Sequence, residues 1–279
     1  MNLCYSVNSE YVKYLYVSLT ALFQNNPGEK INVTVFYLEL SDHEQEILSD
    51  LARSFHQGLQ CIPVDPTLFA DFHAEPYPLE AYLRLCVPYK LPDEVDRILY
   101  LDVDTIVEKP LEEFYNTDFF DYYAVVCRDL KLIEREENGI RQTVRDESSD
   151  YFNSGVMLCN LKKIREDFRF EDFVRYAKEQ NYNLPYADQD ILNGLFAGKV
   201  VYADPDRYNY LVNMEVRYGY SQELATDAVI RHYAGNCPWH RVKVVPSHKR
   251  WWHYAKQTPF YEELLEMKLK GASLPKRLQ

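Results

Sequence analysis

The order of the first predicted strands and helices most limits what this chain can fold into. Residues 3–7, 31–38 and 59–64 are short, largely apolar segments that favour strands. Helical patterns separate them, one beginning at Tyr11 and one at the capping sequence Ser41-Asp42-His43-Glu44. Strands joined through helices pair in parallel with right-handed crossovers. The sequence therefore predicts an α/β fold, a single Rossmann-like domain around a mixed, mainly parallel sheet.

A pair of acids follows a later strand. Residues 97–101 form another apolar segment, and Asp102-Val103-Asp104 comes directly after it. Unpaired carboxylates at the end of a buried strand are costly to desolvate, and a hard divalent ion such as Mg²⁺ or Mn²⁺ relieves that cost. A solvated turn with two acids is the alternative, and both remain open. Ligands of such sheets bind beyond the carboxyl ends of the strands, where Asn8 is also expected.

Further segments extend this pattern. Strands are predicted at 122–127, 151–159, 199–202 and 229–232, and helices at 79–86, 161–180 and 191–196. Arg84 lies in an apolar helical run, so its guanidinium needs either an acid or a phosphate as partner. Asp188 and Asp190 begin a helix, where they either complement its dipole or serve a site. The densely charged residues 131–150 are predicted to form an exposed excursion.

Composition excludes some partners. The formal net charge of −12 argues against nucleic acid, whose phosphates require Lys and Arg. The 24 Tyr and 14 Phe suit a cleft that stacks on sugar or base rings. The six cysteines form no C-x-x-C pair, which indicates buried thiols in a reducing compartment. Without a leader or membrane-spanning run, we expect a cytoplasmic protein with at most peripheral contact to the inner face of a membrane.

Four segments, in this order, resemble the retaining glycosyltransferases of family eight, which include bacterial lipopolysaccharide galactosyl- and glucosyltransferases and the glycogenins. They are Leu99-Tyr100-Leu101-Asp102-Val103-Asp104, Tyr151-Phe152-Asn153-Ser154-Gly155-Val156, Asp188-Gln189-Asp190-Ile191-Leu192-Asn193 and His232-Tyr233-Ala234-Gly235 before Pro238-Trp239. The resemblance spans residues 1 to 240 or so. It implies a nucleotide-sugar-binding domain of the GT-A type over residues 1–245 and a small C-terminal helical appendage over 246–279.

The resemblance also implies roles for single residues. Asp102, Asp104 and His232 match the family's Mn²⁺ ligands, which hold the diphosphate of a UDP-sugar; without the acids, His232 would be a buried core histidine. The remaining matches concern the donor. The residues that match contacts to the donor sugar are Arg84, Asp129, Asn153, Asp188 and Gln189. The edge that holds uridine is matched by Tyr5, Ser6, Val7 and Asn8. The donor site is expected to be further lined by Asp102, Val103 and Gly235.

The activity implied is transfer of a hexose, glucose or galactose, from a UDP-sugar to a saccharide or glycolipid acceptor, as in lipopolysaccharide or surface polysaccharide synthesis. Asp188 and Gln189 are the expected catalytic pair. Gln189 is a poor nucleophile, which favours attack on the leaving-group face, with Gln189 stabilising the oxocarbenium-like state. Two rivals remain: a Mg²⁺-dependent phosphatase of the haloacid dehalogenase type with Asp102 as nucleophile, and a weakly active nucleotide-sugar binder.

Two positions depart from the family pattern. Asn8 stands where the family usually has an acid. The family's Gly-x-x-Lys-Pro-Trp is shortened to Gly235-Asn236-Cys237-Pro238-Trp239, and the Lys that touches the diphosphate is missing. Arg241 and Lys243 are the nearest candidates to replace it, and a solvated position for both is an equal alternative.

Overall fold

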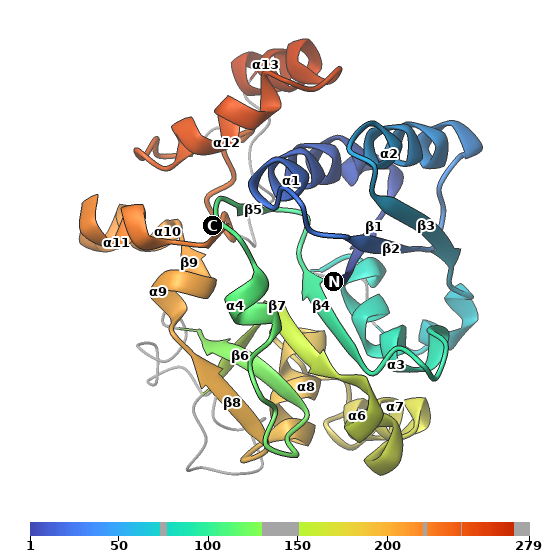
Figure 1. Ribbon diagram of the computed structural model, residues 1–279. Coiled ribbons are helices and arrows are strands. Elements are labelled where there is room, and N and C mark those ends of the chain that lie inside the picture. The colour runs from blue at the N-terminus through green and yellow to red at the C-terminus, as the bar shows by residue number, and fades with distance from the viewer. Residues whose placement is uncertain (73–76, 130–150, 220–221, 241, 271–279) are drawn as a thin grey trace.

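The structure is a computed structural model and describes residues 1–72, 77–129, 151–219, 222–240 and 242–270. The predicted excursion over 131–150 lies outside the described residues. Figure 1 shows one body built around a central sheet, with helices on both of its faces.

The central sheet has seven strands in the order β3-β2-β1-β4-β7-β6-β8. Their bounds are Asn2–Val7 (β1), Asn32–Tyr37 (β2), Gly58–Pro63 (β3), Arg97–Leu101 (β4), Ala124–Arg128 (β6), Phe152–Asn160 (β7) and Val200–Ala203 (β8). Strand β1 pairs in parallel with β2 and β4, as β2 does with β3 and β6 with β8. Only β7 runs antiparallel to both neighbours. The predicted mixed, mainly parallel sheet is confirmed.

Helices cover the sheet on two sides because strand side chains alternate between its faces. Leu3, Tyr5 and Val7 of β1 pack toward one layer, and Cys4 packs toward the other. The first layer holds α1 (Val12–Asn25), α2 (Asp42–Ser54), α4 (Glu112–Tyr115) and α9 (Pro205–Tyr208). The second holds η3 (Leu79–Cys86), α3 (Val87–Lys90), α6 (Leu161–Asp167), α7 (Phe170–Glu179) and α8 (Asp188–Phe196). Short turns η1 (Ser9–Tyr11) and η2 (Pro66–Phe69) complete the first third.

The single helix predicted over 161–180 is wrong, because the structure has two helices there, α6 and α7. The backbone is extended at Phe168, with φ −130° and ψ 150°. This break lets the Phe168 ring pack against Tyr123 and Phe196, at centroid distances of 5.1 and 5.8 Å. The Asp172 carboxylate then accepts the Arg169 N–H at 2.6 Å and begins the second helix.

A second, three-stranded sheet places a distant histidine beside the paired acids. Its order is β5-β10-β9, with β5 at Thr105–Val107, β9 at Tyr210–Leu211 and β10 at Ile230–His232. In the antiparallel β10–β5 ladder His232 lies opposite Thr105. Because Thr105 directly follows Asp104, this register brings the imidazole to the end of β4. Helices α10 (Asn213–Tyr218) and α11 (Gln222–Asp227) lie between β9 and β10 in the chain.

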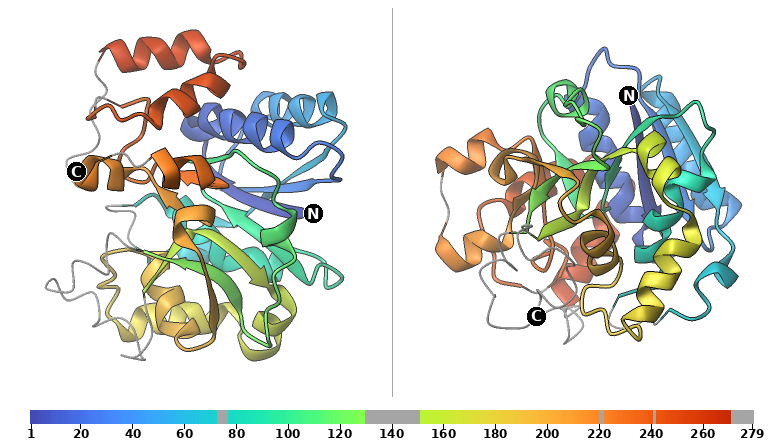
Figure 2. Two further views of the ribbon diagram at one scale, coloured as in Figure 1. Left: turned by 60° about the vertical axis from the view of Figure 1, so that its left-hand side comes forward. Right: turned by 90° about the horizontal axis from the view of Figure 1, so that it is seen from below.

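The C-terminal helices α12 (His248–Ala255) and α13 (Tyr261–Lys270) lie on the outer side of α1, away from the sheet (Figures 1 and 2). Trp251 is fully buried, and Trp239 stacks on Tyr14 of α1 at 4.0 Å between ring centroids. Lys13 pairs with Glu263 at 2.6 Å. All six cysteines are free thiols and five are buried, as expected. Among the described residues, no helix combines the length and the apolar character that crossing a bilayer requires.

Candidate active site

The predicted site residues gather at one edge of the central sheet, around a cleft of about 410 Å³. The carboxyl ends of β1, β4 and β6 meet at this edge, and the antiparallel β7 contributes its amino end. The helix start at Asp188 faces the same space. The predicted residues that line the cleft are Ser6, Val7, Asn8, Arg84, Asp102, Val103, Asp104, Asp129, Asn153, Asp188, Gln189, His232 and Gly235.

Tyr5 does not line this cleft. It is fully buried in the layer that contains α1, where the Ser18 hydroxyl donates to its Oη at 3.3 Å. The reason is its place on β1, where it shares a face with Leu3 and Val7. The Tyr5 side chain therefore belongs to the core.

Asp102, Asp104 and His232 form a cluster that fits a divalent cation. The His232 Nε2 lies 3.1 Å from Asp104 Oδ1 and 3.8 Å from Asp102 Oδ2, and one ligand atom of each lies within 4.8 Å of the others. Burial lowers the pKa of His232, but the two carboxylates together raise it above its ordinary value. The local field thus favours positive charge. Two carboxylate oxygens and an imidazole nitrogen are suitable ligands for Mn²⁺ and similar ions.

Arg84 joins the metal cluster to the acid at the start of α8. Its Nη2 lies 2.9 Å from Asp102 Oδ1, and its Nε lies 2.9 Å from Asp188 Oδ2. The guanidinium stacks over Tyr100, with its Cζ 4.4 Å from the ring centroid. Of the two readings of Arg84, the structure shows the internal ion pair, in a residue that also lines the cleft.

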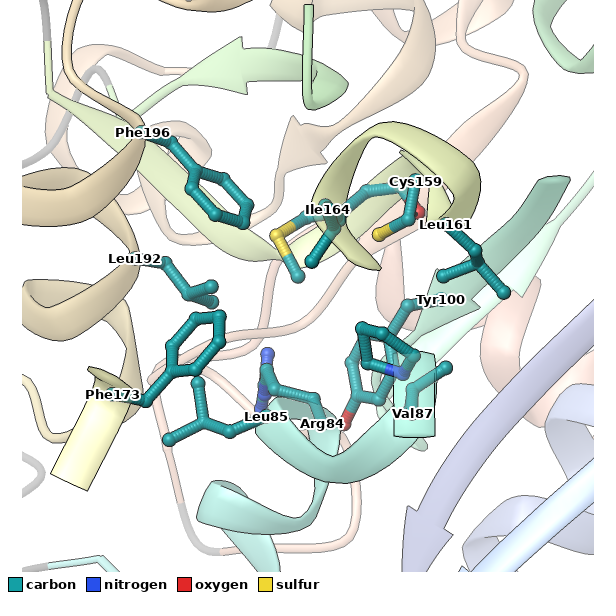
Figure 3. Close-up of a pocket in the computed structure, with 12 residues that line it drawn as sticks. Arg84, Leu85, Val87, Tyr100, Cys159, Leu161, Ile164, Phe173, Leu192 and Phe196 are labelled. Atoms are coloured by element: carbon teal, nitrogen blue, oxygen red, sulfur yellow. Dashed lines mark hydrogen bonds between the residues drawn. The ribbon is translucent and has the colours of Figure 1, made fainter. Parts of the chain in front are cut away.

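The environment of Arg84 on its far side is apolar. Figure 3 shows Arg84 and Tyr100 at the wall of a small cavity of about 20 Å³, among side chains from η3, α6, α7 and α8 that include Leu85, Phe173 and Phe196. These side chains are buried and apolar, so charge pairs at Arg84 are screened less than in solvent. The guanidinium is therefore held rigidly against its two acids.

Two acids at the start of α8 point in different directions. Asp190 accepts the Tyr186 N–H at 2.8 Å and the Tyr151 hydroxyl at 2.6 Å, so it fixes the preceding turn. Asp188 accepts the Ser154 hydroxyl at 2.9 Å within the cleft wall. Burial, with a smaller opposing effect of Arg84, raises the pKa of Asp188 to about 6. Asp190 thus stabilises the turn that precedes α8, whereas Asp188 belongs to the cleft.

Gln189 is held by a network of amides and one acid. Its Oε1 accepts the Ser154 backbone N–H at 3.0 Å and the Asn153 Nδ2 at 3.2 Å. Its Nε2 donates to Asp129 Oδ2 at 3.4 Å, and Asn153 Nδ2 donates to the same oxygen at 3.1 Å. These contacts fix both ends of the Gln189 amide at the cleft wall.

At the positions that depart from the family pattern, Asn8 and Gly235 line the cleft and Lys243 does not. Asn8 Oδ1 accepts the Tyr11 N–H at 3.2 Å and caps η1. Gly235 has φ 74°, a conformation that glycine adopts without strain. Lys243 is exposed and donates to the Val216 carbonyl at 3.3 Å, and Arg241 lies outside the described residues.

Sequence reasoning missed several residues that line the cleft: Tyr11, Tyr77, Glu80, Tyr186, Trp239 and His240. It also missed Asn209, which contacts His232 from behind at 2.8 Å. Only two of the cleft residues carried a signal, because Trp239 ends the shortened loop motif and His240 follows it directly.

Comparisons with known proteins agree with this geometry. The family described as "Glycosyl transferase family 8" matches residues 2–243. A putative glycosyltransferase of Haemophilus influenzae is 30% identical over 246 residues, covering 86% of this chain and 73% of that protein. A lipopolysaccharide 1,2-glucosyltransferase of Escherichia coli is 27% identical over 251 residues, covering 86% and 73%. The crystal structure of the galactosyltransferase LgtC with donor and acceptor sugar analogs superposes with a TM-score of 0.81 at 27% identity, covering 93% of this chain and 96% of LgtC.

This chain belongs to glycosyltransferase family 8 and is a glycosyltransferase with the GT-A fold. Its partners are therefore a sugar donor and a sugar acceptor, and the enzymes of this family use a nucleotide-sugar donor with a divalent metal. The phosphatase alternative is wrong, since the paired acids lie at the end of a strand in the middle of a glycosyltransferase sheet.

Proposed function

We propose that the enzyme transfers a hexose, glucose or galactose, from a UDP-sugar to a saccharide or glycolipid acceptor of the bacterial surface, with retention of configuration. The observation that carries the proposal is the Asp102, Asp104 and His232 cluster beside Arg84 and Gln189 in one cleft. A lipopolysaccharide 1,2-glucosyltransferase of Escherichia coli and a lipopolysaccharide 1,3-galactosyltransferase of Salmonella typhimurium among the relatives support this acceptor class. An acceptor of this class supports the proposal that the enzyme acts in the cytoplasm, at the inner face of the membrane.

The cluster would hold one Mn²⁺ or Mg²⁺ ion through Asp102, Asp104 and His232. When bound, the ion supplies positive charge to the diphosphate that leaves. The uracil and ribose would lie along Ser6, Val7 and Asn8, and the C-terminal loop at Gly235 would lie over the diphosphate. Arg84 keeps Asp102 and Asp188 in place through two charged contacts.

The reaction breaks the bond between the anomeric carbon and UDP and forms one to an acceptor hydroxyl on the same face. The hydroxyl proton passes to the departing phosphate oxygen. The Gln189 amide, fixed by Ser154 and Asp129, would place its dipole beside the anomeric carbon, where positive charge develops. Asp188 and Asn153 would hold the sugar hydroxyls in this geometry.

Metal-dependent release of UDP from a panel of UDP-sugars tests the proposal. Wild-type protein with Mn²⁺ is expected to hydrolyse one UDP-hexose slowly without acceptor and to bind UDP in calorimetry. Asp104→Ala should abolish metal-dependent UDP binding, whereas Asp50→Ala on the exposed face of α2 serves as the control. UDP binding by Asp104→Ala at wild-type affinity, with and without Mn²⁺, would contradict the assignment. Tight UDP-sugar binding without any release would identify the weakly active binder instead.

A further inference from the structure

A backbone N–H fixes the direction of a chain of side-chain hydrogen bonds behind the metal cluster. The Gly155 N–H donates to the side chain of Asn153 at 3.0 Å. A backbone nitrogen only donates, so the Asn153 atom that it meets is the carbonyl oxygen Oδ1. The orientation of the Asn153 amide is therefore determined by the backbone of β7, and the two possible amide flips are distinguished.

Asn209 continues this chain to the imidazole. Its Nδ2 lies 2.9 Å from Asn153 Oδ1, which is an acceptor, so this end of Asn209 must be the donor. The other end, Oδ1, then lies 2.8 Å from His232 Nδ1. An amide oxygen only accepts, so Nδ1 carries the proton. Nε2 is the nitrogen that faces Asp104 Oδ1 at 3.1 Å and Asp102 Oδ2 at 3.8 Å, and its lone pair becomes available to a metal ion when Nε2 carries no proton.

Asn209 also connects two halves of the cleft. It is 1% exposed, lies between α9 and β9, and does not itself line the cleft. The Asn153 amide that it contacts donates through Nδ2 to Asp129 and to Gln189, at 3.1 and 3.2 Å. A substitution of Asn209 is thus expected to alter the position of His232 on one side and of the residues around Gln189 on the other.

We propose that Asn209 is a positioning residue that holds His232 in the Nδ1–H tautomer required for a metal ligand and aligns Asn153 with the sugar side of the cleft. This inference rests on the proposed function, which makes His232 a ligand. Residues that orient a ligating histidine typically contribute about 10- to 100-fold to metal affinity. The two halves of the role use different atoms of one amide, so they are separable by substitution.

Two variants, Asn209→Leu and Asn209→Asp, separate the contact with His232 from the contact with Asn153. Leu removes both hydrogen bonds, and Mn²⁺ affinity of the protein without donor, measured by the electron paramagnetic resonance of free Mn²⁺, should fall about 10- to 100-fold. Asp keeps an acceptor for the Nδ1–H but places a second acceptor against Asn153 Oδ1. Its Mn²⁺ affinity should therefore stay within about 3-fold of wild type, while its kcat falls and its KM for acceptor changes little.

His232→Ala tells failure of this inference from failure of the proposed function. If His232→Ala leaves Mn²⁺ affinity unchanged, the metal cluster itself is wrong. If His232→Ala weakens Mn²⁺ binding but Asn209→Leu, folded by circular dichroism, binds like wild type, only the role of Asn209 is overturned. Equal losses of Mn²⁺ affinity in Asn209→Leu and Asn209→Asp would also overturn it. The histidine side-chain ¹⁵N spectrum, recorded at a pH where His232 is neutral and assigned with His232→Ala, should show the Nδ1–H tautomer in wild type and lose this preference in Asn209→Leu.

Discussion

Gly155 leaves no room for a side chain, and this predicts a sharp effect of one methyl group. A Cβ built on Gly155 would lie 2.4 Å from His232 Cε1 and 2.5 Å from Asp102 Oδ2. Ordinary contacts of a Cβ begin near 3.4 Å, so each neighbour would have to move by roughly 1 Å. Gly155→Ala therefore forces two members of the cluster apart.

The expected losses follow from this displacement. Metal–ligand distances tolerate only about 0.2 Å, so Mn²⁺ affinity should fall at least about 10-fold. Overpacking in the sheet should also cost about 1–3 kcal/mol of unfolding free energy. Mn²⁺ titration followed by electron paramagnetic resonance measures the first quantity, and urea unfolding measures the second.

Gly194→Ala is the matched control. Its Cβ would lie 2.0 Å from Tyr176 Oη in the contact between α7 and α8, so it is also overpacked but touches no member of the cluster. It should lose stability comparably and keep wild-type Mn²⁺ affinity. A Gly155→Ala protein that binds Mn²⁺ like wild type would refute the reasoning, whatever its stability.

The remaining predictions concern single residues. Gln189→Ala should lower kcat about 10- to 100-fold while UDP affinity stays near wild type, since the amide acts on the transition state; collapse of UDP binding would show a structural role instead. If His240, which lines the cleft, offsets the missing Lys, His240→Ala should weaken UDP binding and His240→Lys should restore it. Equal UDP affinities of wild type and His240→Ala in calorimetry would exclude this role of His240. Burial lowers the pKa of His248 to about 4, so stability should fall as pH drops below the unfolded-state value near 6.5 and level off below 4, by about 3 kcal/mol in all; a flat urea-unfolding profile over this range contradicts it. Ala187 has φ 52° and ψ −122°, so Ala187→Gly should raise the free energy of unfolding by about 1 kcal/mol. An unchanged free energy of unfolding would show that no strain is stored there.

The fold was largely predictable because buried strands and helices leave recognisable patterns of apolar residues in the sequence. The short apolar strands and the capping sequence at Ser41 appear where expected, with Glu44 Oε2 accepting the Ser41 N–H at 2.8 Å. The break between α6 and α7 was not predictable from periodicity. An apolar stripe records which side chains are buried, but not that the backbone extends at Phe168 to insert its ring.

The site divides in the same way. Acids that follow a buried strand are conspicuous, because charge seldom occurs there without a partner, and Asp102 and Asp104 lie in the cleft. Tyr5 could have been assigned to the core, since it shares a face of β1 with the apolar residues Leu3 and Val7. Asn209 carried no local signal. Its contacts with His232 and Asn153 span 23 and 56 residues along the chain, and only the folded sheet brings them together.

The antiparallel placement of β7 has a consequence for how such enzymes diversify. Strand β6 ends and β7 begins at the rim of the cleft, where the Asp129 N–H donates to the Tyr151 carbonyl at 3.0 Å. This hydrogen bond fixes Asp129 and Tyr151, the two described residues that flank residues 130–150, beside each other. Closure entropy grows only with the logarithm of loop length, so doubling that segment would cost about 0.6 kcal/mol. An insertion between Asp129 and Tyr151 would accordingly leave unchanged the strands that hold Asp102 and Asn153.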